Sequence, residues 1–385
     1  MRVLVIGFPH SIHIARALGL LARSEVDVHV VPSVDEPWLR EITDATLHHL
    51  DPAVAAPADE TVRVIVHHPP AEVTPDRSGR ADRVAAIVRE IRPHLVHAHE
   101  FQASGVLAAA VSERLGRAMP PLVVSNWGSD AYWFARTAAG RRDIRRVLAA
   151  ADALACESER DVGICLGLGF RGTVLPVQPI AGGLDHDQCE ALAVAGPVSG
   201  REGIIVKGRE SWAGRAGRAV AALAGCGELL TGRELILHSA SPGVPERFSE
   251  LAKSVGARFT LLDGVGHAEV LRAFGRSRVS LAVSASDGIS QTLLEAMACG
   301  AFPVQTHTAT VREWFVDGVG GLAVDVADHM GIVRAVRRAL TDDALVDGAP
   351  VSNRATLLRR ADRGTITRRT LASYRSVLAA ARPRG

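Results

Sequence analysis

The sequence predicts an α/β protein of two doubly wound domains, each a parallel β-sheet covered by helices. Strand-like apolar runs alternate with helix-like segments along nearly the whole chain, which indicates parallel sheets. The 385 residues exceed what one hydrophobic core usually holds. A Gly- and Pro-containing connector at 191–203 separates two such series. We therefore expect a first domain at 1–190, a second at 201–364 and a C-terminal helix within 365–385.

The first series contains five apolar runs of strand length separated by amphipathic segments. These strands are expected at 2–6, 26–31, 62–66, 95–98 and 122–125. Helical spacing of apolar residues predicts helices over 12–23 and 80–91. Two prolines, Pro176 and Pro179, and the Gly182-Gly183 pair close this half.

The second series repeats the alternation and then ends in a helix over about 365–380. Its strands are expected at 204–206, 234–238, 258–261, 279–284 and 301–305. A helix should begin near Gln291, because Leu293, Leu294 and Met297 share one helical face. Gly300 can adopt the left-handed conformation that often follows a helix end, and Pro303 prevents the helix from continuing.

The segment 286–300, SDGISQTLLEAMACG, places two carboxylates eight positions apart across this loop and helix. The free N–H groups of the helix start would lie at the carboxyl end of a parallel strand, where an anion fits. Glu295 lies about one turn inside the helix and could reach a sugar hydroxyl, while Asp287 stands at the loop entrance. The alternative is an amphipathic surface helix with a solvated Glu.

Asp287-Gly288, followed by LEAMA at 294–298 and by Gly300, resembles the Glu-x7-Glu signature of retaining glycosyltransferases of family 4, with Asp as the first carboxylate. The resemblance implies the GT-B architecture, two facing Rossmann-like domains with a C-terminal helix that crosses back to the first. It also implies that Glu295 holds the nucleotide ribose, that Asp287 contacts the donor sugar, and that loop amides bind the phosphates. The loop residues concerned are Gly288, Ile289, Ser290, Gln291 and Thr292, with Ser290 where many members have Gly.

Other parts of the second half extend the resemblance. Lys207 directly ends an apolar strand, and with Arg215 it resembles the family's pair of phosphate-binding cations; Arg209 competes for the first role. LDGVGH at 262–267, with Val265 at its centre, resembles the loop that receives the base through backbone groups. Glu313 resembles the family's helix-end Glu, and an exposed charge before a loop is an equal alternative.

The first half carries three weaker signals. Gly7 follows the first strand, but GFPHSIH lacks the further glycines of a dinucleotide fingerprint, which disfavours a dehydrogenase. The resemblance places this loop, with His13, beside the donor phosphates and the acceptor. His99 stands just beyond a strand and resembles the family's His that touches the donor sugar. NWGSD at 126–130 resembles the family's HGxD turn, and its aromatic neighbours would form an acceptor wall or fill the core.

Composition excludes several classes of protein. A formal net charge of +2 gives no reason to expect nucleic acid as a partner. Five cysteines without paired spacing favour a reducing, cytoplasmic location and argue against a zinc site. The sequence contains neither an apolar run of membrane-spanning length nor the pattern of a signal peptide.

The expected function is metal-independent, retaining transfer of a sugar from a nucleoside-diphosphate sugar to a hydroxyl of a soluble small acceptor, for example in secondary (antibiotic) metabolism. No cofactor is expected, and neither is strong membrane association, because residues 1–180 hold 19 Arg and no Lys against 21 Asp and Glu. A sugar-nucleotide epimerase of the same architecture and a catalytically silent nucleotide-sugar-binding protein are the alternatives.

Overall fold

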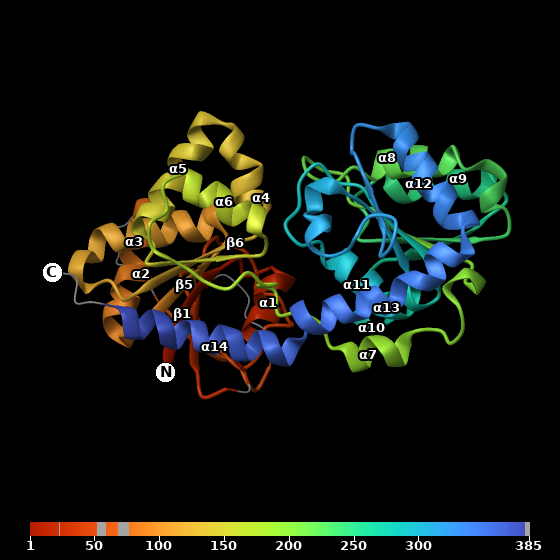
Figure 1. Ribbon diagram of the computed structural model, residues 1–385. Helices are drawn as coiled ribbons and strands as arrows, with labels where there is room; N and C mark the ends of the chain where they lie inside the picture. Colours follow the sequence, from red (N-terminus) through yellow and green to blue (C-terminus); the bar gives the residue numbers. More distant parts are fainter. Residues whose placement is uncertain (23, 52–58, 68–76, 382–385) are drawn as a thin grey trace. The chain divides into compact units, whose positions relative to one another are not determined.

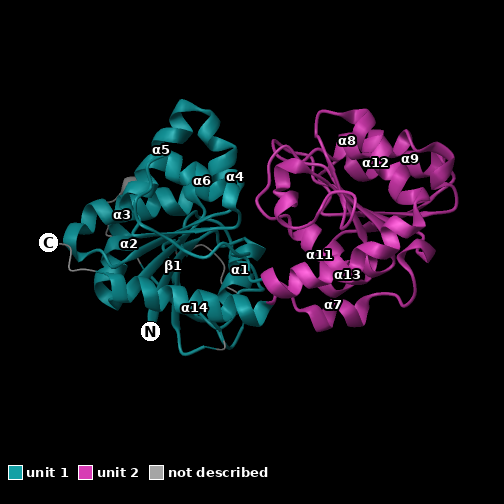
Figure 2. Cartoon of the chain, in the orientation of Figure 1, with its two compact units in different colours: residues 1–183, 363–385 teal, residues 184–362 magenta. Residues whose placement is uncertain are grey.

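The computed structural model describes residues 1–22, 24–51, 59–67 and 77–381. The chain forms two compact units, unit 1 from residues 1–183 and 363–385 and unit 2 from residues 184–362 (Figure 2). The chain thus passes from unit 1 into unit 2 and returns to unit 1 for its last helix.

Unit 1 contains an eight-stranded sheet in the order β4-β3-β2-β1-β5-β6-β7-β8, with every strand parallel to its neighbours (Figure 1). The strands are β1 (Arg2–Gly7), β2 (Asp27–Pro32), β3 (Thr46–His49), β4 (Arg63–Val66), β5 (Leu95–His99), β6 (Leu122–Asn126), β7 (Ala153–Cys156) and β8 (Thr173–Val174). The helices are α1 (Ile12–Gly19), α2 (Arg77–Ile91), α3 (Val106–Leu115), α4 (Ser129–Tyr132), α5 (Ala138–Ala150), α6 (Glu159–Gly167) and α14 (Arg363–Ala380).

Both faces of this sheet are buried, which explains why its central strands are continuously apolar. Leu4 and Ile6 of β1 pack with α2, α3, α5 and α6 on one face. Val3 and Val5 point to the opposite face, where α1 and α14 cover the sheet. The C-terminal helix therefore completes the core of unit 1.

Unit 2 contains a six-stranded parallel sheet in the order β11-β10-β9-β12-β13-β14. The strands are β9 (Gly203–Lys207), β10 (Glu234–His238), β11 (Arg258–Leu262), β12 (Ser277–Ala282), β13 (Phe302–Thr306) and β14 (Leu322–Val324). The helices are α7 (His186–Leu192), α8 (Ala216–Ala224), α9 (Val244–Ser254), α10 (His267–Gly275), α11 (Gln291–Cys299), α12 (His329–Thr341) and α13 (Asp343–Arg360).

The helices of unit 2 also cover both sheet faces. Ile204 and Val206 of β9 pack with α8, α9, α12 and α13. Ile205, which points the other way, packs with α10 and α11. The two-sheet α/β fold class expected from the sequence is confirmed.

The division between the units lies earlier than the predicted boundary at residue 190. Residues 184–190 belong to unit 2, because α7 packs against α10 and α11. The returning segment likewise begins at Arg363 rather than 365.

Among the described residues no helix is long and apolar enough to cross a lipid bilayer.

Candidate functional site

The loop 283–290 and helix α11 leave the sheet of unit 2 at the carboxyl end of β12. The helix begins at Gln291, as predicted, and ends at Gly300, whose φ of 82° is the left-handed conformation that glycine favours. Ser290 is the N-cap, but its hydroxyl makes no capping hydrogen bond and is buried without a partner. The first turn of α11 therefore keeps backbone donors that no side chain caps, together with the positive end of the helix dipole.

Glu295 is not a solvated surface residue, because only 5% of it is exposed. Its Oε1 accepts a hydrogen bond from His267 Nε2 at 2.7 Å and one from Gln291 Nε2 at 3.3 Å. These contacts fix the carboxylate about one turn inside α11. The alternative of a freely solvated Glu is thus wrong.

His238 lies near Glu295 at the end of β10. Its Nε2 is buried without a partner, and its Nδ1 lies 3.1 Å from Ser239 Oγ. Burial lowers the pKa of His238 to about 4, against the opposing influence of Glu295, so the ring is neutral at pH 7. Neither His238 nor the side chain of His267 was expected at this site. His238 had one signal in the sequence, its position at the end of an apolar strand.

Lys207 and Asp287 are joined by an ion pair, with Lys207 Nζ 3.2 Å from Asp287 Oδ2. Lys207 ends β9 as expected, and its strand neighbour in the register is His238. The other oxygen of Asp287 accepts from the backbone N–H of Gly288 at 3.0 Å. The predicted phosphate cation and the predicted sugar-binding carboxylate therefore lie together at the edge of the sheet.

The two other candidate cations differ from Lys207 and from each other. Arg215 precedes α8, and its guanidinium donates to the carbonyl of Gly214 at 2.8 Å. Arg209 is exposed. Glu210 accepts from the N–H of Gly217 at 2.6 Å, so a carboxylate already occupies the start of α8. The assignment of Lys207, Arg209 and Arg215 to phosphate groups remains a prediction.

The loop after β11 is open to solvent. Val265 at its centre is 41% exposed, and Gly264 before it adopts a φ of 63°. The expected role of 262–267 in receiving the base remains a prediction. Ile289 and Thr292, in contrast, are buried and support the loop and the first turn of α11.

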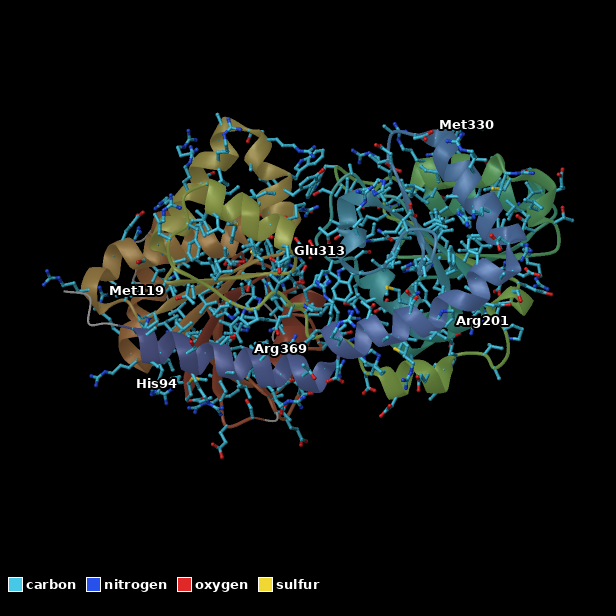
Figure 3. All side chains as sticks on the ribbon, in the orientation of Figure 1. His94, Met119, Arg201, Glu313, Met330 and Arg369 are labelled. Carbon is cyan, nitrogen blue, oxygen red and sulfur yellow. The ribbon has the colours of Figure 1, made fainter. Side chains whose placement is uncertain are left out.

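Glu313 lies at the end of a short 3-10 helix, Val311–Glu313 (Figure 3). Its carboxylate is 3.6 Å from the Arg360 guanidinium, which also hydrogen-bonds the Glu313 carbonyl. Glu313 is therefore ion-paired with α13 and is not the freely exposed charge of the alternative interpretation.

In unit 1, His99 is the last residue of β5 and is 3% exposed. Burial lowers its pKa to about 3, so its imidazole is neutral at pH 7. The next residue, Glu100, has a φ of 71° and a ψ of 157°, a strained conformation for a residue with a side chain. Glu100 then accepts hydrogen bonds from Gln102, Ala103 and Ser104 at the start of a π-helix, Phe101–Gly105. Both features are typical of functional sites.

The NWGSD turn is built around Asp130. Its Oδ2 accepts from the backbone N–H groups of Trp127 at 2.9 Å and Phe101 at 3.2 Å, which ties the turn to the π-helix. Burial and the neighbouring Glu100 raise the pKa of Asp130 well above its usual range. Trp127 contacts His13 and His99, with ring centroids 5.4 and 6.2 Å away.

The packing of unit 1 explains why position 7 is a glycine. A Cβ at this position would lie 2.4 Å from Ile14 Cδ1, so glycine allows α1 to approach β1. The predicted role of Gly7 beside the donor remains a prediction.

Among the described residues, no three His, Cys, Asp or Glu side chains are grouped so that they could hold a metal ion.

Comparisons with known proteins match both units. Residues 2–158 match the family model Glycosyl transferase 4-like, and residues 216–342 match Glycosyl transferases group 1. A search of curated proteins gave no significant match.

Solved structures share the fold at low sequence identity. Anabaena HepE in complex with UDP has a TM-score of 0.69 and 15% identity, over 98% of this chain and 100% of that one. Sucrose-phosphate synthase from Thermosynechococcus elongatus has a TM-score of 0.72 and 14% identity, over 99% and 100%. An Escherichia coli trehalose-6-phosphate structure bound with UDP-2-fluoro glucose has a TM-score of 0.69 and 12% identity, over 97% and 99%. By its two family models the chain is a glycosyltransferase, with a 4-like N-terminal part and a group 1 C-terminal part, and the solved structures show that it has the GT-B fold.

Proposed function

We propose that this glycosyltransferase moves a sugar, with retention of anomeric configuration, from a nucleoside-diphosphate sugar to a hydroxyl of a soluble small acceptor. The observation that carries the proposal is the grouping in unit 2 of Lys207, Asp287, Glu295 and the uncapped start of α11 at one edge of a parallel sheet. This edge is where open α/β sheets bind nucleotides.

Each part of a nucleotide sugar has a complementary group at this edge. The buried carboxylate of Glu295 is suited to accept hydrogen bonds from the ribose hydroxyls, and the exposed backbone near Val265 can receive the base. Asp287 can bind hydroxyls of the sugar. Because HepE binds UDP and UDP-glucose, uridine donors are the first to test.

The diphosphate gains charge as it leaves, and fixed positive groups stabilise that charge. Lys207, Arg215 and the N–H groups at the start of α11 would supply this stabilisation from the protein itself. We therefore propose that the reaction needs no metal ion.

In the proposed reaction the acceptor hydroxyl attacks the anomeric carbon from the face that the diphosphate leaves. The bond from that carbon to the phosphate oxygen breaks, and the acceptor proton passes to the leaving phosphate. No side-chain nucleophile is required. Because the imidazole of His99 is neutral, it can hydrogen-bond a sugar hydroxyl without adding positive charge.

The acceptor is proposed to be a small, soluble hydroxyl compound, such as a cyclitol or a sugar of a secondary metabolite, and the enzyme to act in the cytoplasm. The first 180 residues carry 19 Arg and no Lys against 21 acidic residues, so they lack the basic excess that binds anionic lipid. Co-sedimentation with anionic vesicles at physiological salt would contradict this part of the proposal.

A thermal-shift screen of UDP, GDP, ADP and dTDP sugars, followed by mass spectrometry with candidate acceptors, tests the function. We expect one donor class to raise Tm and to give an acceptor whose mass has increased by one sugar. A donor that binds but is never consumed would support the alternative of a catalytically silent nucleotide-sugar-binding protein. A donor converted to an isomer of equal mass would support the epimerase.

A further inference from the structure

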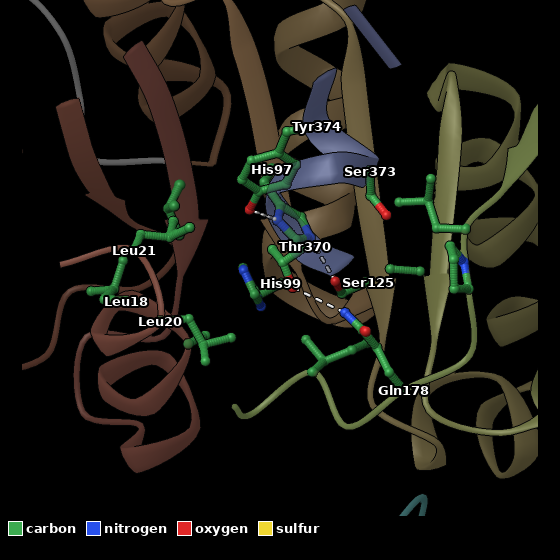
Figure 4. A pocket seen from close by; sticks show the side chains of 16 residues that line it. Leu18, Leu20, Leu21, His97, His99, Ser125, Gln178, Thr370, Ser373 and Tyr374 are labelled. Carbon is green, nitrogen blue, oxygen red and sulfur yellow. Dashed lines mark hydrogen bonds between the residues drawn. The ribbon is translucent and has the colours of Figure 1, made fainter. Parts of the chain in front are cut away.

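A small cavity lies in unit 1 between the sheet, α1 and α14 (Figure 4). Its volume is about 40 Å³. Its polar lining comes from strand ends, from the segment after β8 and from α14, namely His97, His99, Ser125, Gln178, Thr370 and Ser373. The middle of the C-terminal helix thus lies beside the His99 imidazole.

Two polar atoms at this cavity are buried without a hydrogen-bond partner. They are His99 Nδ1 and Gln178 Oε1. The amide of Gln178 is held by its other end, because Nε2 donates to Thr370 Oγ1 at 2.9 Å. An acceptor oxygen and a ring nitrogen therefore face one small cavity, and leaving both unpaired is energetically unfavourable.

We propose that this cavity binds an ordered water molecule that bridges Gln178 Oε1 and His99 Nδ1, and that Gln178 is thereby a positioning residue for His99. A buried water needs about 10–15 Å³ of such volume and two to four polar partners. The cavity provides the space and the two free partners. The proposal rests on the proposed function only in giving His99 a role at the donor sugar.

The consequence for His99 is a fixed tautomer. A neutral imidazole has one N–H donor and one acceptor nitrogen, and the hydrogen bond at one nitrogen decides the state of the other. A water that donates one hydrogen to Gln178 Oε1 has a second hydrogen to donate, and His99 Nδ1 is the other unpaired atom at the cavity. His99 therefore accepts at Nδ1 and carries its proton on Nε2.

The ring is also held from its other side. His97 lies against His99 with ring centroids 4.1 Å apart, and hydrogen bonds at 2.7 and 2.6 Å link His97 to Tyr374 and Ser125. The C-terminal helix thus acts on His99 through Tyr374, which holds His97 against the His99 ring.

The test is the tautomeric state of His99 in the full-length protein, read from ring-nitrogen NMR shifts with ¹⁵N-histidine labelling. The variant His99→Gln assigns the signal. We expect one tautomer in the wild type and a mixture in Gln178→Met, which removes both polar atoms and keeps the side-chain length. Thr370→Val is the matched control, because it removes the Gln178 Nε2 partner but leaves Oε1. It should retain a single tautomer.

With a turned-over donor, Gln178→Met should lower kcat about 3- to 10-fold, as expected for one lost hydrogen bond, with KM changed less than about twofold. Unchanged His99 nitrogen shifts in Gln178→Met would overturn the proposal, and Gln178→Leu serves if the Met variant does not fold. A wild type that transfers no sugar would contradict the proposed function, while the NMR result would still decide the role of Gln178.

Discussion

Glu295 is the residue whose environment differs most from a surface carboxylate. Its burial and its contact with His267 hold one oxygen in place, which prepares the group to receive ribose hydroxyls. Glu295→Gln keeps the size and helix propensity but loses a charge-assisted contact worth about 1.5–3 kcal/mol. Calorimetric titration should show nucleoside diphosphate binding weakened roughly 10- to 100-fold.

Asp287→Asn is the matched comparison on the same loop. If Asp287 binds the sugar, the Asn variant should impair transfer from the intact donor and leave the affinity for free nucleotide nearly unchanged. Equal nucleotide affinity in wild type and Glu295→Gln would mean that the ribose binds elsewhere.

Lys207 and Arg215 are expected to act mainly in the transition state, because the charge of the leaving diphosphate grows there. Lys207→Ala and Arg215→Ala should each lower kcat roughly 10- to 100-fold, with a smaller change in nucleotide affinity. Arg209→Ala is the control, since this exposed side chain lies on the same loop. Normal kcat in the first two variants together with loss in the third would show that Arg209 is the phosphate cation.

Single residues could be predicted from the sequence where a local pattern carries the information. The helix start at Gln291 and the strand end at Lys207 follow from apolar spacing and were confirmed. The Lys207–Asp287 ion pair joins residues 80 positions apart, and His238 approaches Glu295 because β10, β9 and β12 are consecutive in the sheet. Such contacts depend on sheet order, which no local pattern reports.

At the scale of elements, a chain of three imidazoles runs from β2 across β3 to the residue after the edge strand β4 in unit 1. His29 Nδ1 lies 2.8 Å from His48 Nε2, and His48 Nδ1 lies 2.8 Å from His67 Nε2. Asp27 Oδ1 stands 3.3 Å from His29 Nε2 at one end. An ionised Asp27 accepts from His29, so each ring donates through Nε2 and accepts through Nδ1. A proton added to His48 would break this order.

The chain makes the stability of unit 1 depend on pH. Burial lowers the pKa of His48 to about 3, and the neighbouring His29 and His67 add to this effect. An unfolded His titrates near 6.5 and binds the extra proton first, so the stabilisation is complete above pH 6.5 and is lost as the pH falls toward 3. His48 alone should account for about 2 kcal/mol of the loss in unfolding free energy between pH 7 and pH 5.

Urea titrations at these two pH values can measure this contribution. The difference between pH 7 and pH 5 should be smaller in His48→Gln than in the wild type by about that amount, whereas the exposed control His329→Gln should match the wild type. Identical pH dependence in His48→Gln and wild type would show that His48 does not titrate on unfolding.

The elements themselves were predicted best where they are long and uniformly apolar. The strand at 234–238 has the expected bounds, and the last helix ends at Ala380 as expected but begins two residues earlier, at Arg363. The short strands β3, β7, β8 and β14 were not predicted, because two to four residues give too little periodicity. β12 occupies Ser277–Ala282 rather than 279–284, since the chain leaves the sheet once Ser284 N–H bonds the Thr306 hydroxyl.

At the scale of the whole molecule, each unit contributes a different part of the proposed chemistry. Unit 2 holds the groups suited to a nucleotide diphosphate, and unit 1 holds the neutral His99 with its supporting cavity. The alternation of strands and helices predicted both sheets. The boundary was misplaced because α7 follows the Gly182-Gly183 turn immediately and packs on α10 and α11 of unit 2.

The most direct test of the central claim is the anomeric configuration of the first product, measured by ¹H NMR in excess EDTA with the donor found in the screen. An α-linked donor should give an α-linked product, recognised by its anomeric coupling constant, at a rate unchanged by the chelator. An inverted product, or activity abolished by EDTA and restored by magnesium or manganese, would contradict the account.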